Sequence, residues 1–338
     1  MESNNKKLMV SVIGVGHLGT IHAKLLKNNE YANLVGIFDI NREKAYQLAN
    51  ELNCRRFESL DEAKENSDAI IIATPTTTHY EIAQQFLEKS IHCFIEKPIT
   101  VTYKQALHLI EKAKEKNAII QVGHVERFNP ALKAVMKYTP KPLFIESHRL
   151  SQFKLRATDV SVISDLMIHD IDIILWLVKS RIKRIHANGV AVLTDTIDIA
   201  NARIEFENGA VANLTASRIS AKPTRKMRFF QKQAYFSIDF ANQKVEIYKI
   251  VEGSDTQNLG LPAIMLGNIN DSPKNVKIIF EQPEIEESNA IVDEHNSFFR
   301  AILYGEMVPI SAFEASQALR LSEMIERKIL RSLKLNSF

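Results

Sequence analysis

The sequence predicts an α/β protein in which a doubly wound parallel sheet is followed by a strand-rich part. Over the first 125 residues, short apolar runs alternate with helical patterns, as in βαβ units with right-handed crossovers. After one apolar helix at 164–178, most runs alternate apolar and polar residues, which is typical of a mostly antiparallel sheet with one exposed face. The length of 338 residues suits two domains.

The strands expected in the first part are continuous apolar runs, because helices cover both faces of a parallel sheet. They span residues 8–13, 34–38, 69–73, 91–95 and 118–122, and the helices between them span 18–26, 42–52, 80–88 and 103–116. The pattern changes near residue 125, so residues 1–125 are expected to form the first domain.

The second part is expected to hold strands at 184–193, 197–206, 210–217, 226–231, 235–240, 244–251 and 276–280. Asn208-Gly209 between two of them is a hairpin signal, and the stretch 251–274 is expected to be a long surface loop. Helices at 292–304 and 313–333 close the chain. We expect residues 126–311 to form a second domain and residues 312–338 to form a C-terminal helix that packs back on the first.

Composition and charge exclude several classes of protein. The 43 basic and 40 acidic residues leave a net charge of +3, which gives no reason to expect a nucleic-acid or membrane partner. No apolar run reaches the length of about 18 residues that a membrane span needs, and the N-terminal region does not resemble a signal peptide. Cys54 and Cys93 lack a metal or redox spacing and indicate a reducing compartment. We therefore expect a cytoplasmic protein.

A glycine-rich turn of the form GxGxxG joins the first strand to the first helix. It contains Gly14, Gly16 and Gly19, with His17 and Leu18 inside it. Glycines let the backbone approach a pyrophosphate, and the helix N-terminus directs N–H groups at the phosphates. Three glycines alone could form an ordinary loop. Their place between a strand and a helix, followed by a second strand and an acid, predicts a dinucleotide-binding Rossmann domain.

Asp39 follows Gly19 by 20 residues and ends the second strand, where a carboxylate can bind the ribose hydroxyls. A carboxylate there would repel the extra phosphate of NADP, so NAD is the expected cofactor. Arg42 keeps NADP open because it could bind that phosphate, although a solvated helix residue is the simpler interpretation.

Two further groups of residues can carry chemistry. Glu96, Lys97 and Pro98 end a buried strand at the edge where doubly wound sheets bind ligands, although a surface ion pair would have the same spacing. On the apolar helix, Asp165 and His169 are four residues apart, so a carboxylate can polarise an imidazole. Asp170 is expected to face elsewhere, and Asp172 lies one turn beyond His169. Acids clustered around one histidine in an apolar helix are costly unless they are used.

Four segments together resemble the glucose–fructose oxidoreductase/inositol dehydrogenase/rhizopine-catabolism family of NAD(P)-dependent oxidoreductases. They are ATPTTTH at 73–79, EKP at 96–98, VGHVERFNP at 122–130 and SDLMIHDIDIILWL at 164–177. The resemblance covers nearly the whole chain. It implies a Rossmann domain and then an α/β domain with a large open sheet that serves substrate binding and oligomerisation.

The resemblance also implies roles for individual residues. Lys97 would contact both substrate and nicotinamide, His169 would be the general acid/base, and Asp165 would accompany it. The residues expected along the cofactor are Thr74, Pro75, His79 and Glu96, besides those of the glycine turn. Many members have glycines before the histidine where this chain has Leu166, Met167 and Ile168, which leaves the local backbone uncertain.

The segment VGHVERFNPA and the HRL at 148–150 are more similar to members that act on nucleotide-linked amino sugars. This implies oxidation of a secondary hydroxyl to a ketone, with the 3-hydroxyl of UDP-N-acetylglucosamine as the expected site, ahead of an aminotransferase in lipid A assembly. Glu126, Arg127, Asn129 and Arg156 are then candidates for sugar or pyrophosphate contacts. Each of them could equally be a loop or helix-cap residue, as Asn129-Pro130 suggests.

Other functions stay open at this point. The enzyme could act on a free polyol or aldose such as inositol, or on a tetrapyrrole, and a catalytically inactive nucleotide-binding regulator or a structural protein would share the fold. No metal is expected, because the ten histidines are dispersed and hydride transfer needs an oriented cofactor instead. A homo-oligomer, dimer or tetramer, is expected through the C-terminal sheet.

Overall fold

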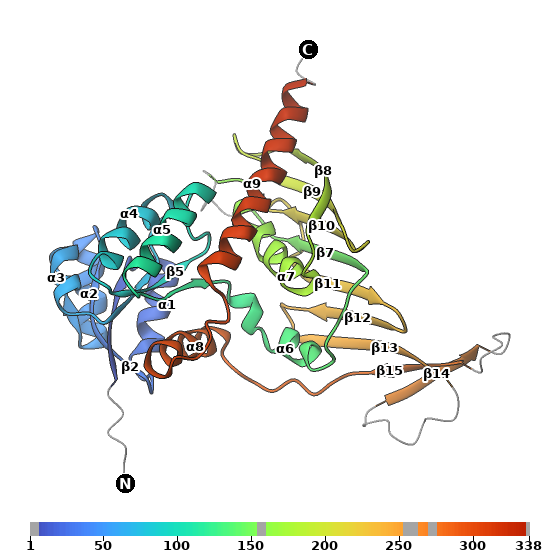
Figure 1. Ribbon diagram of the computed structural model, residues 1–338, viewed down its shortest axis with the longest axis horizontal. Coiled ribbons are helices and arrows are strands. Elements are labelled where there is room, and N and C mark those ends of the chain that lie inside the picture. Colours follow the sequence, from blue (N-terminus) through green and yellow to red (C-terminus); the bar gives the residue numbers. More distant parts are fainter. Residues whose placement is uncertain (1–6, 154–159, 253–262, 270–275, 336–338) are drawn as a thin grey trace, which may run out of the picture. The chain divides into compact units, whose positions relative to one another are not determined.

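The computed structural model describes residues 7–153, 160–252, 263–269 and 276–335. The chain divides into two compact units (Figure 1). The first unit comprises Met1–Val125 and Asn289–Arg320, and the second comprises Glu126–Ser288 and Leu321–Phe338. The sequence places one break near residue 125, where the first division falls, and another at residue 311. The structure instead returns the segment that starts at Asn289 to the first unit.

The first unit contains the expected doubly wound sheet. Its strands are all parallel and lie in the order β3-β2-β1-β4-β5-β6. They are β1 (Leu8–Ile13), β2 (Ala32–Phe38), β3 (Arg55–Arg56), β4 (Ala69–Ile72), β5 (His92–Glu96) and β6 (Ile120–Gly123). The strand order reverses between β1 and β4, and ligands of such sheets bind at this point, beyond the carboxyl ends of the strands.

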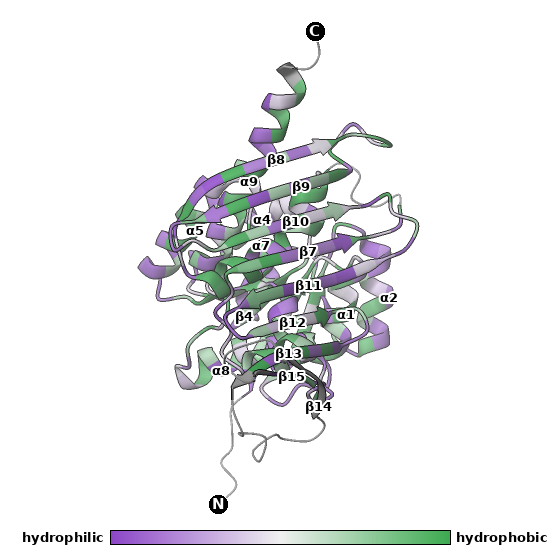
Figure 2. Cartoon of the chain, turned by 90° about the vertical axis from the view of Figure 1, so that its right-hand side faces the viewer, coloured by the Kyte–Doolittle hydropathy of each residue, from purple (hydrophilic) through white to green (hydrophobic). Residues whose placement is uncertain are grey.

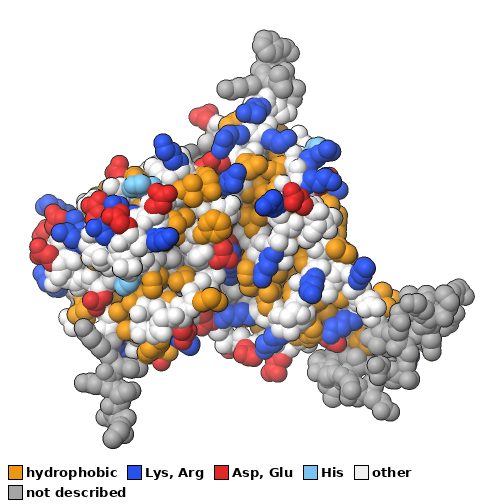
Figure 3. All heavy atoms as spheres, viewed as in Figure 1, with side chains coloured by type: hydrophobic (Ala, Val, Ile, Leu, Met, Phe, Trp, Pro, Cys, Tyr) orange, Lys and Arg blue, Asp and Glu red, His pale blue; other side chains and the backbone are white. Residues whose placement is uncertain are grey.

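Amphipathic helices cover both faces of this sheet. They are α1 (His17–Leu26), α2 (Arg42–Leu52), α3 (Leu60–Glu65), α4 (Thr76–Leu87), α5 (Tyr103–Glu115) and α8 (Ala290–Tyr304). Acidic and basic side chains are interspersed on the outer surface of these helices (Figure 3). Phe298 and Phe299 of α8 pack into the same core as Val10, Leu26 and Ile71, which explains why the chain returns to this unit. The short elements β3 and α3 were not predicted, because they are too short to show a period.

The second unit contains a nine-stranded sheet among the described residues, in the order β14-β15-β13-β12-β11-β7-β10-β9-β8. Its strands are β7 (Phe144–Leu150), β8 (Ile182–Val190), β9 (Ile199–Phe206), β10 (Val211–Ser217), β11 (Thr224–Gln231), β12 (Ala234–Asp239), β13 (Lys244–Glu252), β14 (Ala263–Ile269) and β15 (Val276–Glu281). Neighbours are antiparallel except for β7 and β10. The predicted large, mostly antiparallel sheet is confirmed, and Figure 2 looks onto its open face.

The other face of this sheet is covered by helical segments. They are the 3-10 helix Val125–Phe128, α6 (Pro130–Met136), the π turn Ile163–Met167 and α7 (Ile168–Val178). Met227, Phe229, Phe236 and Ile247 of the sheet are fully buried beneath them. The last helix, α9 (Ala312–Leu335), begins in the first unit and ends in the second. Among the described residues, we find no helix with the length and apolar character of a membrane span.

Two predictions about strands were wrong. The stretch 251–274 was expected to be a loop, but Ala263–Ile269 forms strand β14, which pairs with β15; residues 253–262 and 270–275 lie outside the described residues. Strand β7 was not predicted at all. Two of its buried positions are held by Ser147 and Arg149, so its inward face does not read as apolar.

Asp198 fixes the loop between β8 and β9. One of its carboxylate oxygens accepts the backbone N–H groups of Val192, Leu193 and Thr194 at 2.7, 2.6 and 3.0 Å, and the other accepts the Thr194 hydroxyl at 2.8 Å. Burial alone would raise the pKa of Asp198, but these hydrogen bonds outweigh burial and lower it to about 2. The folded state therefore favours the ionised carboxylate.

We expect Asp198→Asn to lower the free energy of unfolding at neutral pH by about 1–3 kcal/mol, because the three N–H groups lose a charged acceptor. The folded pKa is depressed, so this stabilisation is present above the unfolded-state pKa of about 4 and is lost as the pH falls toward 2. Urea unfolding of both proteins across this range measures it. A difference that does not shrink on acidification would contradict the assignment.

Candidate active site

The glycine turn of the first unit has the geometry of a phosphate cradle. Gly14 is buried with φ of +90°, a conformation that favours glycine, and a Cβ at Gly19 would lie 1.8 Å from the Gly14 carbonyl oxygen. The first residues of α1 therefore pack directly on the end of β1. A Cβ at Gly16 would meet no atom within 4 Å, so open space lies above the turn.

Asp39 holds this turn in place. Its Oδ2 accepts the backbone N–H of Val15 at 2.6 Å, and its Oδ1 accepts that of Asn41 at 2.8 Å. Each carboxylate oxygen keeps a second lone pair that can accept a ribose hydroxyl. The sequence predicts the ribose contact alone; the structure adds that the same carboxylate ties the end of β2 to the glycine turn.

The residues present fit a dinucleotide. Helix α1 begins after Gly16 without a side-chain cap, so its first N–H groups remain available to phosphate oxygens. Gly16, His17 and Leu18 are exposed around this helix end. Arg42 is exposed at the start of α2, close in sequence to Asp39. This position is compatible with binding of the extra phosphate of NADP and equally with a solvated helix residue.

The ends of β4 and β5 are braced by His79. This ring is 1% exposed, with Nε2 2.9 Å from the Thr74 carbonyl oxygen and Nδ1 2.9 Å from that of Pro98. Burial lowers the pKa of His79, so a neutral ring donates to one carbonyl at a time. Thr74 is half-buried and Pro75 is exposed. His79 thus positions the segment after Lys97, and its predicted cofactor contact stays a prediction.

Glu96 lies beneath Lys97 and is almost fully buried. Its Oε2 accepts the backbone N–H of Lys97 at 3.1 Å, and its Oε1 lies 2.9 Å from Nε2 of His22. Burial raises the pKa of Glu96, but the hydrogen bond from His22 and the charge of Lys97 outweigh burial and bring it below its usual value. His22 was missed as a functional candidate because it occupies an ordinary apolar position of α1.

The acid/base pair of the second unit sits where the helix changes type. Asp165 lies in the π turn, and His169 lies in the first turn of α7. The predicted single α-helix from residue 164 is therefore replaced by two helix types. In a π turn the backbone bonds reach five residues instead of four, so the α-helical spacing argument does not transfer directly. Both side chains are half-buried, and Nδ1 of His169 is fully buried. Single π turns often mark functional sites.

Two buried arginines hold the helix that carries His169. Arg127 forms a two-pronged ion pair with Asp172, with both N–O distances 2.7 Å, and its guanidinium lies 5.2 Å from the Trp176 ring. Arg149 forms another with Asp170 at 3.0 and 2.9 Å. Asp170 and Asp172 thus both act as anchors for α7. Removing one partner of a buried pair typically costs about 3–5 kcal/mol, so these pairs fix the helix firmly.

The remaining candidates for substrate contact lie in the same network. Arg149 also donates to Glu126 at 2.7 Å, and Asn129 donates to the second Glu126 oxygen and to the Phe240 carbonyl, both at 3.2 Å. Glu126, Arg127 and Asn129 are each less than a tenth exposed. Their side chains bind one another, strand β7, helix α7 or the segment after β12, and their predicted contact with a substrate stays a prediction. Arg156 lies outside the described residues.

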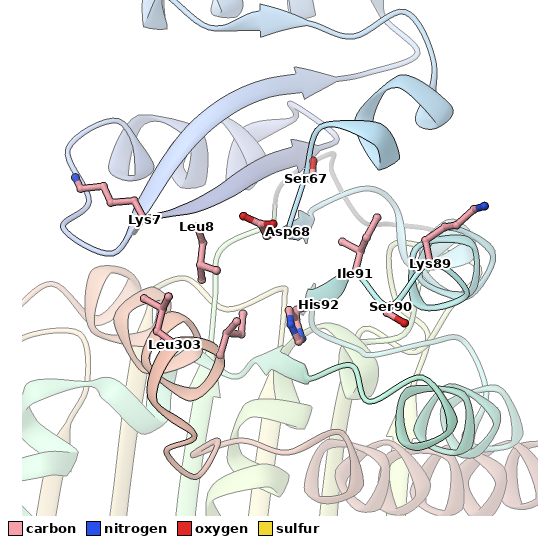
Figure 4. A pocket seen from close by; sticks show the side chains of 10 residues that line it. Lys7, Leu8, Ser67, Asp68, Lys89, Ser90, Ile91, His92 and Leu303 are labelled. Carbon is pink, nitrogen blue, oxygen red and sulfur yellow. The ribbon is translucent and has the colours of Figure 1, made fainter. Parts of the chain in front are cut away.

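A separate hollow of about 430 Å³ lies at the opposite end of the first unit's strands (Figure 4). Several of its polar groups are used within the protein: for example, Asp68 accepts the Met9 backbone N–H, and Nδ1 of His92 accepts that of Ile119. It is distant in the fold from the glycine turn. Among the described residues, no cluster of His, Cys, Asp or Glu is arranged to hold a metal ion.

Family models match both parts of the chain. Residues 8–124 match "Oxidoreductase family, NAD-binding Rossmann fold", and residues 137–237 match the GFO/IDH/MocA C-terminal domain. A UDP-N-acetylglucosamine 3-dehydrogenase from Acidithiobacillus ferrooxidans is 42% identical over 242 residues, which are 71% of this chain and 77% of that protein. The chain belongs to the GFO/IDH/MocA family. It is an oxidoreductase whose first unit carries the NAD-binding domain, as the sequence predicts.

Solved structures agree with this family assignment. The structure of the Acidithiobacillus ferrooxidans UDP-N-acetylglucosamine 3-dehydrogenase has a TM-score of 0.86 and 34% identity, and the match covers 96% of this chain and 98% of that one. Inositol dehydrogenases are also similar to this chain. In sequence, a scyllo-inositol 2-dehydrogenase (NAD(+)) from Bacillus subtilis is 32% identical over 230 residues, which are 62% of this chain and 67% of that protein. A scyllo-inositol dehydrogenase from Lactobacillus casei, solved with NAD(H), has a TM-score of 0.75 at 19% identity and shares the fold.

The open space above Gly16 gives a test of cofactor binding. Gly16 has φ of −64°, which alanine adopts freely, so Gly16→Ala should keep the thermal unfolding midpoint of the wild type. Its methyl group would occupy the cradle, and we expect the Kd for NAD to rise about tenfold or more, or about 1.4 kcal/mol. Calorimetric titration measures it. The control, Gly19→Ala, should lose stability as well, because its Cβ overlaps the Gly14 carbonyl. Unchanged NAD affinity in Gly16→Ala would place the phosphates elsewhere.

Proposed function

We propose that this family member oxidises the 3-hydroxyl of UDP-N-acetylglucosamine to a ketone with NAD as oxidant. The observation that carries the proposal is the match over 96% of the chain to the solved enzyme of that name. The residues support the same chemistry, because Lys97 stands at the carboxyl end of β5 and the Asp165/His169 pair at the start of α7. A regulator without catalysis would not need this set.

The proposed mechanism assigns one task to each of these residues. His169 takes the proton of the secondary hydroxyl through its imidazole, and Asp165 orients and polarises that ring. The ammonium of Lys97 stabilises the alkoxide as it forms. NAD bound at the glycine turn would supply the hydride acceptor for the same carbon, and the alcohol would become a ketone with one proton released. The mechanism requires Lys97 and His169 to face one substrate carbon.

The proposed contacts with NAD all come from residues of the first unit. We propose that the N–H groups at Gly16, His17 and Leu18 bind the pyrophosphate and that Asp39 binds the adenosine ribose, which favours NAD over NADP. Thr74, Pro75, His79 and Glu96 would then lie along the path toward the nicotinamide. Arg42 would lie near the ribose.

The cellular setting follows from the same proposal. The 3-keto sugar is a substrate for amination, which places the reaction ahead of an aminotransferase in lipid A amino-sugar assembly. Cys54 and Cys93 are free thiols, and this supports the reducing environment of the cytoplasm. An inositol is the second candidate substrate, supported by the Bacillus subtilis relative.

Turnover on a defined substrate set tests the proposal. We expect NADH formation, followed by absorbance, with UDP-N-acetylglucosamine and much less with scyllo-inositol, myo-inositol or glucose. His169→Asn and Lys97→Ala should each lower kcat by about 10²–10⁴ while NAD still binds. Near-normal turnover in either variant would remove that residue from the mechanism. Preference for an inositol would replace the proposed substrate, and binding of NAD without turnover of any sugar would support the regulator.

We also propose that two copies associate through the open face of the large sheet. Five aromatic side chains form one cross-strand row on this face: Phe144, Phe230, Tyr235, Tyr248 and Phe280. Successive ring centroids are 5.9, 4.6, 5.3 and 5.0 Å apart. Among the described residues, no helix of the second unit lies over this face of the sheet (Figure 2). Phe230 is exposed and the other four rings are half-buried, so the row leaves apolar surface that a second copy could cover.

Sedimentation equilibrium tests this association. The wild type should sediment as a dimer or tetramer, and Tyr235→Arg should shift it toward smaller species because a charge would be buried in the middle of the row. Glu88→Arg, an exposed charge reversal at the end of α4, should leave the mass unchanged. A monomeric wild type, or a Tyr235→Arg variant of unchanged mass, would contradict the proposal.

A further inference from the structure

Three buried titratable side chains of the first unit form a hydrogen-bonded chain that the proposed mechanism does not use. His295 of α8 approaches His22 of α1, with 2.7 Å between Nε2 and Nδ1. The other ring nitrogen of His22 lies 2.9 Å from Oε1 of Glu96, and Oε2 of Glu96 accepts the Lys97 backbone N–H at 3.1 Å. The chain therefore ends at the residue that is proposed to meet the reacting oxygen.

The chemistry of the groups gives this chain a direction. A carboxylate can only accept, so Nε2 of His22 carries the proton that faces Glu96. Nδ1 of His22 faces Nε2 of His295, and His295 donates from Nε2 when Nδ1 of His22 carries the lone pair. Among the described residues, Nδ1 of His295 is buried without a hydrogen-bond partner, which suits a bare lone pair better than an orphaned N–H. Burial holds the pKa of His295 well below its usual value, so the ring stays neutral.

The surroundings keep the chain rigid and dry. His295 is fully buried and His22 is 1% exposed. Phe94 meets both rings edge to face, at centroid distances of 5.6 and 5.8 Å, and Phe299 packs on His295 at 6.0 Å. Gly123 makes room for the carboxylate, since a Cβ there would lie 2.8 Å from Oε1 of Glu96.

We propose that His22 and His295 are positioning residues that hold the Glu96 carboxylate against Lys97 and so fix the Lys97 amine for its task. The inference rests on the role given to Lys97 in the proposed function. His22 also lies on the helix that begins at the glycine turn, but the chain does not touch the N–H groups at that helix end. It should therefore act on turnover and on the state of Lys97, with little effect on NAD affinity.

The state of Lys97 can be measured without any substrate. His295→Phe keeps a ring among Phe94 and Phe299 but removes the donor, whereas His295→Gln keeps an N–H donor. We expect His295→Phe to raise the rate at which acetic anhydride labels the Lys97 amine by about threefold or more, because a displaced Glu96 carboxylate no longer fixes the backbone that carries this side chain. We expect His295→Gln to restore the wild-type rate. Peptide mass spectrometry quantifies the label, with the exposed Lys104 of α5 as internal reference.

Kinetics give the second readout. We expect His295→Phe to lower kcat by about 10- to 100-fold with an unchanged Kd for NAD, since misplaced reacting groups lose rate without losing cofactor contacts. The matched control is His92→Gln. His92 lies at the opposite end of strand β5 from Glu96 and lines the hollow shown in Figure 4. It should change neither Lys97 labelling nor kcat. Circular dichroism verifies that each variant is folded.

Two results would overturn the inference. One is an unchanged rate of Lys97 labelling in folded His295→Phe; the other is a change in the labelling rate or in kcat that persists in His295→Gln. If His295→Phe does not fold, Glu96→Gln, which keeps the size but removes the charge, must give the same rise in labelling. A wild type that oxidises no sugar nucleotide, but in which labelling responds as expected, refutes the proposed function and leaves the positioning of Lys97 intact. The two failures are thus distinguishable.

Discussion

Carboxylates withdrawn from water need partners, and this constraint shapes both units of the protein. Asp170 and Asp172 are matched by Arg149 and Arg127, and Glu96 is matched by His22. A charge left unpaired in such surroundings costs several kcal/mol, so the segments that supply the partners are held in one arrangement. Each partner comes from a remote part of the chain. The pairs therefore contribute to specifying the tertiary arrangement as well as to local order.

The same constraint explains why each residue that is proposed to react stands next to a buried, paired acid in the sequence. Glu96 is buried and paired, and the next residue is Lys97; Asp170 is buried and paired, and the residue before it is His169. In each case a fixed ionic side chain sets the backbone of the neighbour that is proposed to react. Precise placement of a reacting group is worth orders of magnitude in rate, so a rigid neighbour is useful to an enzyme.

Much of this architecture could be predicted from sequence, because its signals are local. The apolar runs of the parallel sheet and the glycine turn each occupy a few consecutive residues. What failed depends on partners far along the chain. Strand β7 was hidden because Arg149 is buried by acids it meets only after folding, and the π turn at Ile163–Met167 has no periodic signature. His295 lies 273 residues from His22, so no spacing rule could join them. The meeting of Lys97 with His169 is likewise a prediction about distant segments.

The first unit is assembled from two separate stretches of chain. Helix α8, from the later stretch, supplies Phe298 and Phe299 to the core and His295 to the chain that ends at Lys97. A fragment cut after Val125 would lack all three and would expose the apolar surface they cover, so the nucleotide-binding half should not survive as a contiguous piece. Because the second unit is likewise made of two stretches, exchange of substrate domains between relatives, by recombination or in the laboratory, would need three crossover points instead of one. The fold thus favours inheritance of the first and second units together.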